Sequence, residues 1–255
     1  MKSKSIWTAS AIIVLSFFGQ PVYAQVVLPI NPLLAAYPPV TSEQLLKPAD
    51  GDWKLIRRTY DGWAYSPLTQ INASNVAKLK PVWSFATGVI NGHQAPPIIN
   101  GGVMFISTPG NQVLALDAKT GNQLWRYKRP LAEDAIILHP TNRGVALLGD
   151  KVYFASGDAV LVAIDAKTGK EAWATKVAEN KNGYYMSLAP LVAEGKVMVG
   201  VSGGELGIRG FIAAYDAGTG KESWKTHTVP APGEPGSETW PAGGDQWKTG
   251  GGLFG

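Results

Sequence analysis

Short apolar segments, each followed by a glycine-containing turn, recur along most of the chain. Apolar strands are predicted at 113–116, 161–164 and 211–215, and each one runs into an Asp-Ala-x-Thr-Gly sequence. In such a turn the aspartate accepts hydrogen bonds from backbone N–H groups two or three residues on, and the glycine supplies a positive φ. A segment that carries a tryptophan follows every turn. Each unit therefore predicts a β-hairpin.

The hairpins belong to an internal repeat that is marked by its tryptophans. Trp125, Trp173 and Trp224 are 48 and 51 residues apart, and Trp83 precedes the first of them by 42 residues as the tail of an earlier, incomplete copy. Further strands that open with glycine, and short apolar runs, are predicted upstream of the hairpins at 102–107, 149–156, 195–201, 95–99 and 188–192. Four strands are thus expected per unit.

A period of this size is typical of solenoids and propellers. Four-stranded sheets that are arranged radially bury both faces against their neighbours, and this arrangement is a β-propeller. We therefore predict an all-β fold, a β-propeller of four-stranded blades with one tryptophan motif each. A linear β-solenoid is the alternative, although its coils are usually shorter than this repeat. Helix is expected only as short elements at 42–46 and 72–79.

The composition agrees with an all-β chain. Of 255 residues, 30 are glycine, 18 are proline and 9 are tryptophan, and charged residues make up 16%. A coiled coil, a long helical bundle or an acidic disordered chain needs more charges or fewer turn-forming residues. The absence of cysteine excludes disulfides, iron–sulfur clusters, thiol catalysis and a covalently attached haem within the chain. The net charge of +4 comes without a long basic run, so no nucleic-acid partner is expected.

The first 24 residues have the three parts of a secretory signal peptide. Lys2 and Lys4 give a positive start, 6–18 is mostly apolar, and Val22 and Ala24 put small residues at the positions that signal peptidase reads. The apolar run is shorter than the ~20 residues of a spanning helix, and no transmembrane segment is expected after it. We therefore expect residues 1–24 to direct export and 25–255 to form the mature domain, with an uncleaved anchor as the alternative.

Two charged residues stand out in glycine-rich or apolar surroundings. Glu205 follows a valine-rich strand inside a turn with several glycines, so it is either a solvated acid or a buried anion that needs a cation. Ca²⁺ suits such a position because it takes oxygen ligands in irregular geometry. Arg143 precedes the apolar run 145–148 and is either a surface arginine or a guanidinium fork for a carboxylate or carbonyl oxygen.

Ser202 suggests a different class of enzyme. The five residues from Gly200 to Gly204 formally match the G-x-S-x-G pattern of serine hydrolases. That motif requires a strand, a turn and a helix in succession. Because 207–215 predicts a loop and a strand, a serine hydrolase is the weaker alternative.

The tryptophan repeat, combined with segments 142–144, 202–210 and 245–251, resembles the quinoprotein alcohol dehydrogenases. The resemblance implies an eight-bladed periplasmic propeller that binds pyrroloquinoline quinone (PQQ) and Ca²⁺, with a lanthanide as an alternative metal. It implies oxidation of an alcohol to an aldehyde or ketone, with electrons passed to a cytochrome c or a quinone. The alternative is a non-catalytic periplasmic propeller that serves as a scaffold or binding protein and lacks the pair Arg143 and Glu205.

The resemblance also implies which residues hold the cofactor and the metal. Glu205 matches the family's first Ca²⁺ ligand, and Arg143 and Ser187 match side chains that contact the quinone. Gln94 stands where many members have glutamate, so it keeps an acceptor but loses the charge. The implied cofactor-binding residues are Gln94, His139, Arg143, Ser187, Ser202, Gly203 and Gly204. At the two glycines, the missing Cβ would let the backbone approach the quinone.

His139 replaces a feature of the family. Many members cover one face of the quinone with a disulfide between adjacent cysteines shortly before the Asn-Arg-Gly sequence. The corresponding stretch here, 136–141, contains no sulfur. We expect His139 or Leu138 to form this cover, and a histidine that caps a strand end is the alternative.

Several functional residues of the family have no counterpart in the chain. In the family, the motif at 247–252 continues into a threonine and a tryptophan that stacks beneath the quinone, whereas this chain ends Leu253-Phe254-Gly255. The second calcium ligand, the aspartate general base and further blades lie beyond that point in the family. We therefore predict no catalytic residue here. We interpret the chain as a C-terminally truncated propeller of about three blades and part of another, inactive alone.

Overall fold

The computed structural model describes residues 30–241, 243–249 and 251. The predicted signal peptide, residues 1–24, lies outside the described residues. Within the described ranges, helix is confined to short elements: α1 (Pro32–Ala35), α2 (Ser42–Leu46) and the 3₁₀ turns η1 (Val76–Lys78), η2 (Asn180–Asn182), η3 (Gly204–Leu206), η4 (Ser237–Thr239) and η5 (Gln246–Lys248). The short helical elements predicted at 42–46 and within 72–79 are confirmed.

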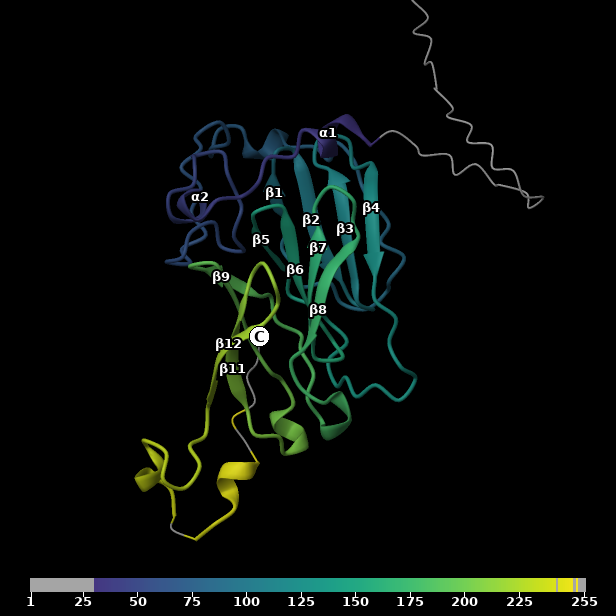
Figure 1. The fold of residues 1–255 in the computed structure, drawn as a ribbon. Coiled ribbons are helices and arrows are strands. Elements are labelled where there is room, and N and C mark those ends of the chain that lie inside the picture. Colours follow the sequence, from purple (N-terminus) through teal and green to yellow (C-terminus); the bar gives the residue numbers. More distant parts are fainter. Residues whose placement is uncertain (1–29, 242, 250, 252–255) are drawn as a thin grey trace, which may run out of the picture.

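Twelve strands of the described chain form three antiparallel sheets, and each sheet contains four strands that are consecutive in sequence (Figure 1). The first sheet consists of β1 (Ile98–Asn100), β2 (Val103–Thr108), β3 (Gln112–Asp117) and β4 (Gln123–Lys128). The second consists of β5 (Val145–Leu148), β6 (Lys151–Ser156), β7 (Val160–Asp165) and β8 (Glu171–Lys176). The third consists of β9 (Leu191–Ala193), β10 (Lys196–Gly200), β11 (Phe211–Asp216) and β12 (Glu222–His227). These are the predicted propeller blades, and the linear solenoid is wrong.

The first strand of each sheet is where prediction and structure differ. β1 and β9 begin at Ile98 and Leu191, three residues after the predicted starts at 95 and 188. Pro97 and Pro190 lie directly before them, and proline has no N–H to donate to a neighbouring strand. The prediction contains no counterpart of β5, because its four apolar residues lack the alternation that marks a half-buried strand.

The predicted Asp-Ala-x-Thr-Gly hairpin turns are present in all three sheets. In the first, Asp117 Oδ1 accepts from the N–H groups of Lys119 (2.8 Å) and Thr120 (3.3 Å). These bonds stabilise the ionised carboxylate and lower the pKa of Asp117. Gly121 ends the turn at φ 76°, with its N–H bonded to Asp117 O at 2.8 Å. Each hairpin also has a register shift at the same place, directly after the alanine–tryptophan pair that precedes the turn: Ala115–Trp125, Ala163–Trp173 and Ala214–Trp224. Such a bulge bends the strand and increases its twist.

Each blade is joined to the next through a tryptophan. The Nε1–H of Trp125, in β4, donates to Ala166 O (2.8 Å) in the turn that follows β7. Its ring covers Gly169, where an added Cβ would lie 2.8 Å from the indole. Trp173 of the second sheet makes the same two contacts with the turn of the third sheet. The turn glycine is therefore required twice, once for its positive φ and once for the ring above it.

The two ends of the repeat show what these contacts contribute. Trp83 donates to Ala118 O (3.2 Å) and covers Gly121, although its own segment, 79–97, is described without a strand. Trp83 is thus the tail of an earlier unit, as predicted. Trp224, in β12, is 40% exposed, whereas Trp125 is 8% exposed. An indole is buried where a turn of a following blade lies beneath it.

The segment between α1 and Tyr60 ties the three sheets together. It pairs with β1 through the backbone of Trp53 and with the β5–β6 turn through the backbone of Val40. Tyr60 Oη donates to Val192 O in β9 at 2.6 Å. One stretch of chain thus contacts the first strand of each blade or the turn that follows it. The side chains of Leu55 and Ile56 on this stretch pack against the common apolar core.

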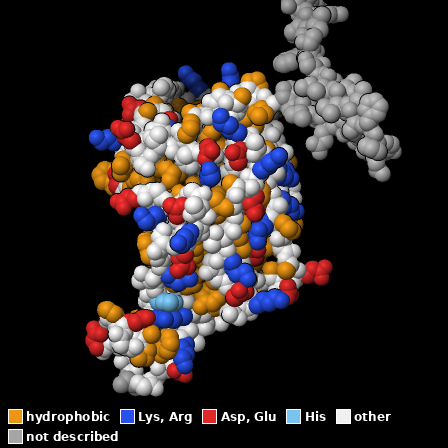
Figure 2. Space-filling view, in the orientation of Figure 1, with side chains coloured by type: hydrophobic (Ala, Val, Ile, Leu, Met, Phe, Trp, Pro, Cys, Tyr) orange, Lys and Arg blue, Asp and Glu red, His pale blue; other side chains and the backbone are white. Residues whose placement is uncertain are grey.

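Charged side chains cover the surface of the sheets without a block of one sign on the face drawn in Figure 2. Pairs such as Lys176–Glu179 and Lys225–Glu222, each 2.9 Å apart, join opposite charges three residues apart in sequence. None of the helical elements in the described part of the chain has the length and apolarity of a membrane span.

We predict that Gly169→Ala destabilises the chain more than Gly195→Ala does. Both glycines have a positive φ, 69° and 72°, so both variants lose about 1–2 kcal/mol to backbone strain. Only at Gly169 would the new Cβ meet an indole, whereas nothing lies within 4 Å of a Cβ at Gly195. Overpacking adds about 1–3 kcal/mol at Gly169. Urea unfolding of the two variants measures the difference, and equal free energies of unfolding would contradict the contact.

Candidate functional site

Arg143 is held at the start of the second blade by the loop that leads into the third. It directly precedes Gly144 and β5, and its backbone N–H donates to Ser187 O at 3.0 Å. Its Nη1 donates to Ser187 Oγ at 2.7 Å. Ser187 lies just before β9, so the two residues connect neighbouring blades. The structure thus brings together two of the residues that the sequence analysis selected.

Asn142, the residue before Arg143, anchors this loop to the first two sheets. Asn142 is buried, and its Nδ2 donates to Ala155 O in β6 at 2.9 Å. Its Oδ1 accepts from the hydroxyl of Ser107 in β2 and from the N–H of Gly144 at 3.1 Å. One amide side chain therefore ties the first blade, the second blade and the Arg143 loop together. Sequence reasoning used Asn142 only as part of a motif and did not identify this role.

Ser202 lies two residues after the end of β10 and is paired with Tyr185. The two residues exchange backbone hydrogen bonds, Ser202 N to Tyr185 O at 2.8 Å and Tyr185 N to Ser202 O at 3.3 Å. Residues that are directly opposite in an antiparallel pair project their side chains to the same face. Both side chains are buried, and neither Tyr185 Oη nor Ser202 Oγ has a hydrogen-bond partner among the described residues.

Gly203 needs to be glycine for a reason that the sequence analysis did not give. It has φ 120°, and an added Cβ would lie 2.2 Å from Gly183 O. The missing side chain thus makes room for another backbone segment of this chain. After it, Gly204 opens η3 and Gly207 closes it at φ 71°. Glu205 is carried on this short, glycine-flanked 3₁₀ turn.

Glu205 lies beside His139. Glu205 Oε1 is 3.6 Å from His139 Nε2, and the two side chains are 40% and 55% exposed. The ring of His139 packs against that of Tyr185, with centroids 6.3 Å apart and planes inclined by 51°. Leu138, the other residue expected to cover the quinone, is exposed. The predicted positions 139 and 205, which come from different blades, are thereby neighbours.

Tyr185 is the residue that links these groups, and the sequence analysis did not consider it. Burial raises the pKa of its hydroxyl, the carboxylate of Glu205 raises this pKa further, and the guanidinium of Arg143 lowers it. Both charged side chains are therefore close enough to act on one phenol. The available signal was its position two residues before Ser187, in the segment that the family resemblance had already connected with the cofactor.

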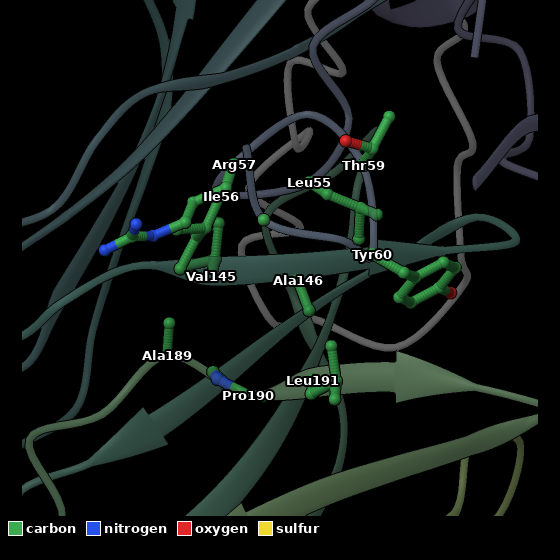
Figure 3. A pocket seen from close by; sticks show the side chains of 11 residues that line it. Leu55, Ile56, Arg57, Thr59, Tyr60, Val145, Ala146, Ala189, Pro190 and Leu191 are labelled. Carbon is green, nitrogen blue, oxygen red and sulfur yellow. The ribbon is translucent and has the colours of Figure 1, made fainter. Parts of the chain in front are cut away.

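Two hollows lie next to Arg143. One, of about 540 Å³, is lined by Gln94, Arg57 and Arg143 together with apolar side chains. The second, of about 270 Å³, is apolar and lies between the 55–62 segment and β5, shown in Figure 3. The two share Ile56, Arg57 and Ala189. Gln94, although distant in sequence, is thus brought to the same hollow as Arg143.

Glu205 does not belong to a larger group of metal-binding side chains. Among the described residues, no three histidine, aspartate or glutamate side chains converge as a metal site would require. A hard cation such as Ca²⁺ takes about 6–8 oxygen ligands, including backbone carbonyls and water. Within this part of the chain, Glu205 would therefore be the charged ligand of a site completed by other oxygen atoms.

The serine hydrolase alternative for Ser202 is wrong. β10 ends at Gly200, and the chain continues through the 3₁₀ turn η3 into β11. A nucleophile elbow needs an α-helix after the turn. Ser202 Oγ also has no histidine partner to activate it among the described residues.

Comparison with known proteins identifies the family. The family model "Glucose/ethanol/alcohol dehydrogenase, beta-propeller domain" of PQQ proteins matches residues 53–253. The chain is 38% identical over 242 residues to the quinoprotein alcohol dehydrogenase PedH of Pseudomonas putida, covering 85% of this chain and 40% of PedH. It is 37% identical over 254 residues to the lanthanide-dependent methanol dehydrogenase of Methylacidiphilum fumariolicum, covering 87% and 41%.

Solved structures agree with this result. A europium-containing methanol dehydrogenase matches with a TM-score of 0.75 and 35% identity, covering 80% of this chain and 40% of that one. The quinohemoprotein alcohol dehydrogenase ADHIIG of Pseudomonas putida HK5 matches with a TM-score of 0.72 and 41% identity, covering 76% and 30%. The chain spans about two-fifths of the length of PedH and the methanol dehydrogenase. Since the family model covers most of the sequence and the sheets have the same fold, the chain belongs to the PQQ-dependent alcohol dehydrogenase family of β-propeller proteins.

Proposed function

We propose that this chain provides part of the cofactor site of an exported, PQQ- and calcium-dependent alcohol dehydrogenase. The enzyme would oxidise an alcohol to an aldehyde or ketone and pass the electrons to a cytochrome c or a quinone. The observation that carries the proposal is the geometry of Arg143 and Glu205, which come from different blades: Arg143 bonds Ser187 at 2.7 Å, and Glu205 lies 3.6 Å from His139, whose ring packs on Tyr185. Membership of the family supports the reaction class.

The residues fit the cofactor in their chemistry. PQQ carries several carboxylates and two adjacent quinone oxygens, so it needs hydrogen-bond donors and positive charge. Arg143 supplies a guanidinium, Ser187 a hydroxyl next to it, and Ser202 a buried hydroxyl that has no partner among the described residues. A buried polar atom without a partner costs stability until a ligand or water satisfies it. Gln94 would add an uncharged amide from the neighbouring hollow.

The metal would be held on the side of Glu205. Because Gln94 carries no charge, Glu205 would supply the anionic ligand, and backbone oxygens and water would complete the coordination. One of the relatives is a lanthanide-dependent methanol dehydrogenase, so a lanthanide is the alternative metal. Both are hard cations that prefer oxygen ligands, and the same carboxylate serves either one.

Binding and orientation are the chemical contributions of these residues. When bound, the quinone would accept hydride and the cation would polarise its carbonyl group. Arg143 keeps one face of the site positive, and its bond to Ser187 restrains the guanidinium before any ligand arrives. Gly203 and Gly204 lead into the turn that carries Glu205, and the missing side chain of Gly204 would let the backbone approach the ligand. His139, beside Glu205 and Tyr185, would cover the ligand where relatives have a disulfide.

The first residues support a proposal about the location of the protein. We propose that 1–24 is a signal peptide and that the propeller, 25–255, is delivered to the periplasm. The positive start, the apolar run of 6–18 and the small residues at 22 and 24 support this.

The proposal predicts that the 255-residue chain binds PQQ in a metal-dependent way. Titration with PQQ, with and without Ca²⁺, should change the PQQ absorption spectrum at lower concentrations when Ca²⁺ is present. Glu205→Gln keeps the shape of the side chain and removes its charge, so it should abolish the effect of the metal. If the wild-type chain leaves the spectrum unchanged under both conditions, the non-catalytic scaffold is the better assignment.

Arg143→Lys tests the role of the guanidinium. Lysine keeps the charge but cannot donate through a planar fork to a carboxylate and to Ser187 at once. We expect PQQ affinity to fall about tenfold, which corresponds to about 1.4 kcal/mol. Isothermal titration measures it, and an unchanged dissociation constant would show that the charge alone is sufficient.

His139→Ala tests the proposed cover. Removing the imidazole exposes one face of the ligand and of Tyr185, so PQQ should bind more weakly and dissociate faster. His93→Ala is the control, because the ring nitrogens of His93 bond Thr87 and the backbone of Asn91 and make no recorded contact with Glu205 or Tyr185. Stopped-flow dissociation compares the two variants. Equal rates for His139→Ala and wild type would assign His139 to a structural role at the loop end.

A further inference from the structure

The hydroxyl of Tyr185 is an unexplained polar group at the centre of the site. Tyr185 is fully buried, and its Oη has no hydrogen-bond partner among the described residues. Buried polar groups in folded proteins are almost always bonded, and each exception requires an explanation. A buried phenol without a partner lowers the stability of the ligand-free protein. Its presence is explained if the hydroxyl finds a hydrogen-bond partner in another state of the protein. A bound ligand is such a partner.

The position of the phenol indicates where that ligand would lie. Tyr185 is directly opposite Ser202, and both side chains project to one face of their backbone pair. Ser187, two residues further along the chain, holds the guanidinium of Arg143 at 2.7 Å. The residue that carries the phenol is thus paired with Ser202 and lies close in sequence to Ser187, and the side chains of Ser202, Ser187 and Arg143 can all donate hydrogen bonds.

The chemistry of the surrounding groups specifies the kind of ligand atom. A tyrosine is protonated at neutral pH, and burial together with Glu205 keeps it so. Its O–H is therefore available as a donor, and the structure records no bond from it to Glu205 or to His139. A ligand oxygen with negative or carbonyl character would satisfy the phenol and the hydroxyl of Ser202 together.

We propose that Tyr185 is a further cofactor-binding residue, whose Oη donates a hydrogen bond to an oxygen of the anionic quinone held between Arg143 and Glu205. The inference rests on the proposed function, because it assumes that the site takes PQQ. Neither the family motif nor the sequence analysis selects Tyr185. Its ring also supports His139, so the residue contributes both a donor and a wall of the site.

Tyr185→Phe tests the proposal because it removes the hydroxyl and keeps the ring that packs on His139. Tyr215→Phe is the matched control. Tyr215 is also buried with an unpartnered Oη among the described residues, but it pairs with Val197, at the end of β10 remote from Ser202. We expect PQQ to bind Tyr185→Phe about tenfold more weakly in the presence of Ca²⁺, as for a lost hydrogen bond to a charged group. Tyr215→Phe should bind like the wild type.

Unfolding without ligand separates this role from a structural one. Each variant removes a buried donor without a partner, so both should melt at the wild-type temperature or above it when PQQ is absent. A lower melting temperature for Tyr185→Phe would overturn the proposal by showing that the hydroxyl has a partner within the fold. A loss of Ca²⁺ affinity measured without PQQ would also overturn it, because the hydroxyl would then serve Glu205.

The outcome is distinguishable from failure of the proposed function. If the wild type binds PQQ and Tyr185→Phe binds it within a factor of about two, the inference is wrong and the proposed function stands. If the wild type does not bind PQQ, the proposed function fails and the inference fails with it. Weaker binding by Tyr185→Phe alone, with an unchanged control, supports both.

Discussion

An indole ring placed on a glycine of the neighbouring turn is the contact on which the arrangement of the blades depends. Trp125 occupies the space that a side chain would need at Gly169, and its N–H satisfies Ala166 O in the same turn. The packing of the indole on the glycine and its hydrogen bond to the same turn therefore act together, and they fix the distance and the orientation of the second sheet relative to the first. Because the turn glycine already needs a positive φ for its own hairpin, one residue type meets the demands of the hairpin and of the interface.

The site depends on this alignment, since its groups come from different blades. Asn142 ties the Arg143 loop to β2 and β6, the bond from Arg143 to Ser187 reaches the third blade, and the Tyr185–Ser202 backbone pair sets the Glu205 turn. Most of these links are hydrogen bonds of the backbone or of buried side chains. The guanidinium of Arg143 is thus placed by neutral contacts around it, whereas the side chains of Glu205, His139 and Gln94 are exposed to solvent.

Local patterns explain what could be predicted from the sequence. The Asp-Ala-x-Thr-Gly turns and the strands beside them follow from short-range chemistry, and three copies of the repeat show the same pattern, whereas the partners of the tryptophans lie in the next blade and were not predicted. β5 and the late starts of β1 and β9 depend on sheet pairing and on Pro97 and Pro190, which apolar runs do not reveal. At the site, motifs identify Arg143 and Glu205 by residue type. The burial of Tyr185 and the contact of Gly203 with Gly183 O arise from segments that meet only in the folded chain, so periodicity could not indicate them.

The tryptophan follows the turn aspartate at a constant interval, eight residues in each of the three hairpins, whereas the distance from one tryptophan to the next changes from 48 to 51. The bulge and the turn between them leave no freedom for insertion or deletion, because one added residue would point the indole away from its glycine. Variation in length falls instead in the connections between blades, 129–144 and 177–190, and in the loop 201–210 between β10 and β11, whose counterparts 109–111 and 157–159 are much shorter. These segments carry His139, Arg143, Tyr185, Ser187, Ser202 and Glu205. The architecture thus separates a segment of invariable spacing, which keeps the blades in place, from segments in which evolution can lengthen, shorten and diversify the binding surface.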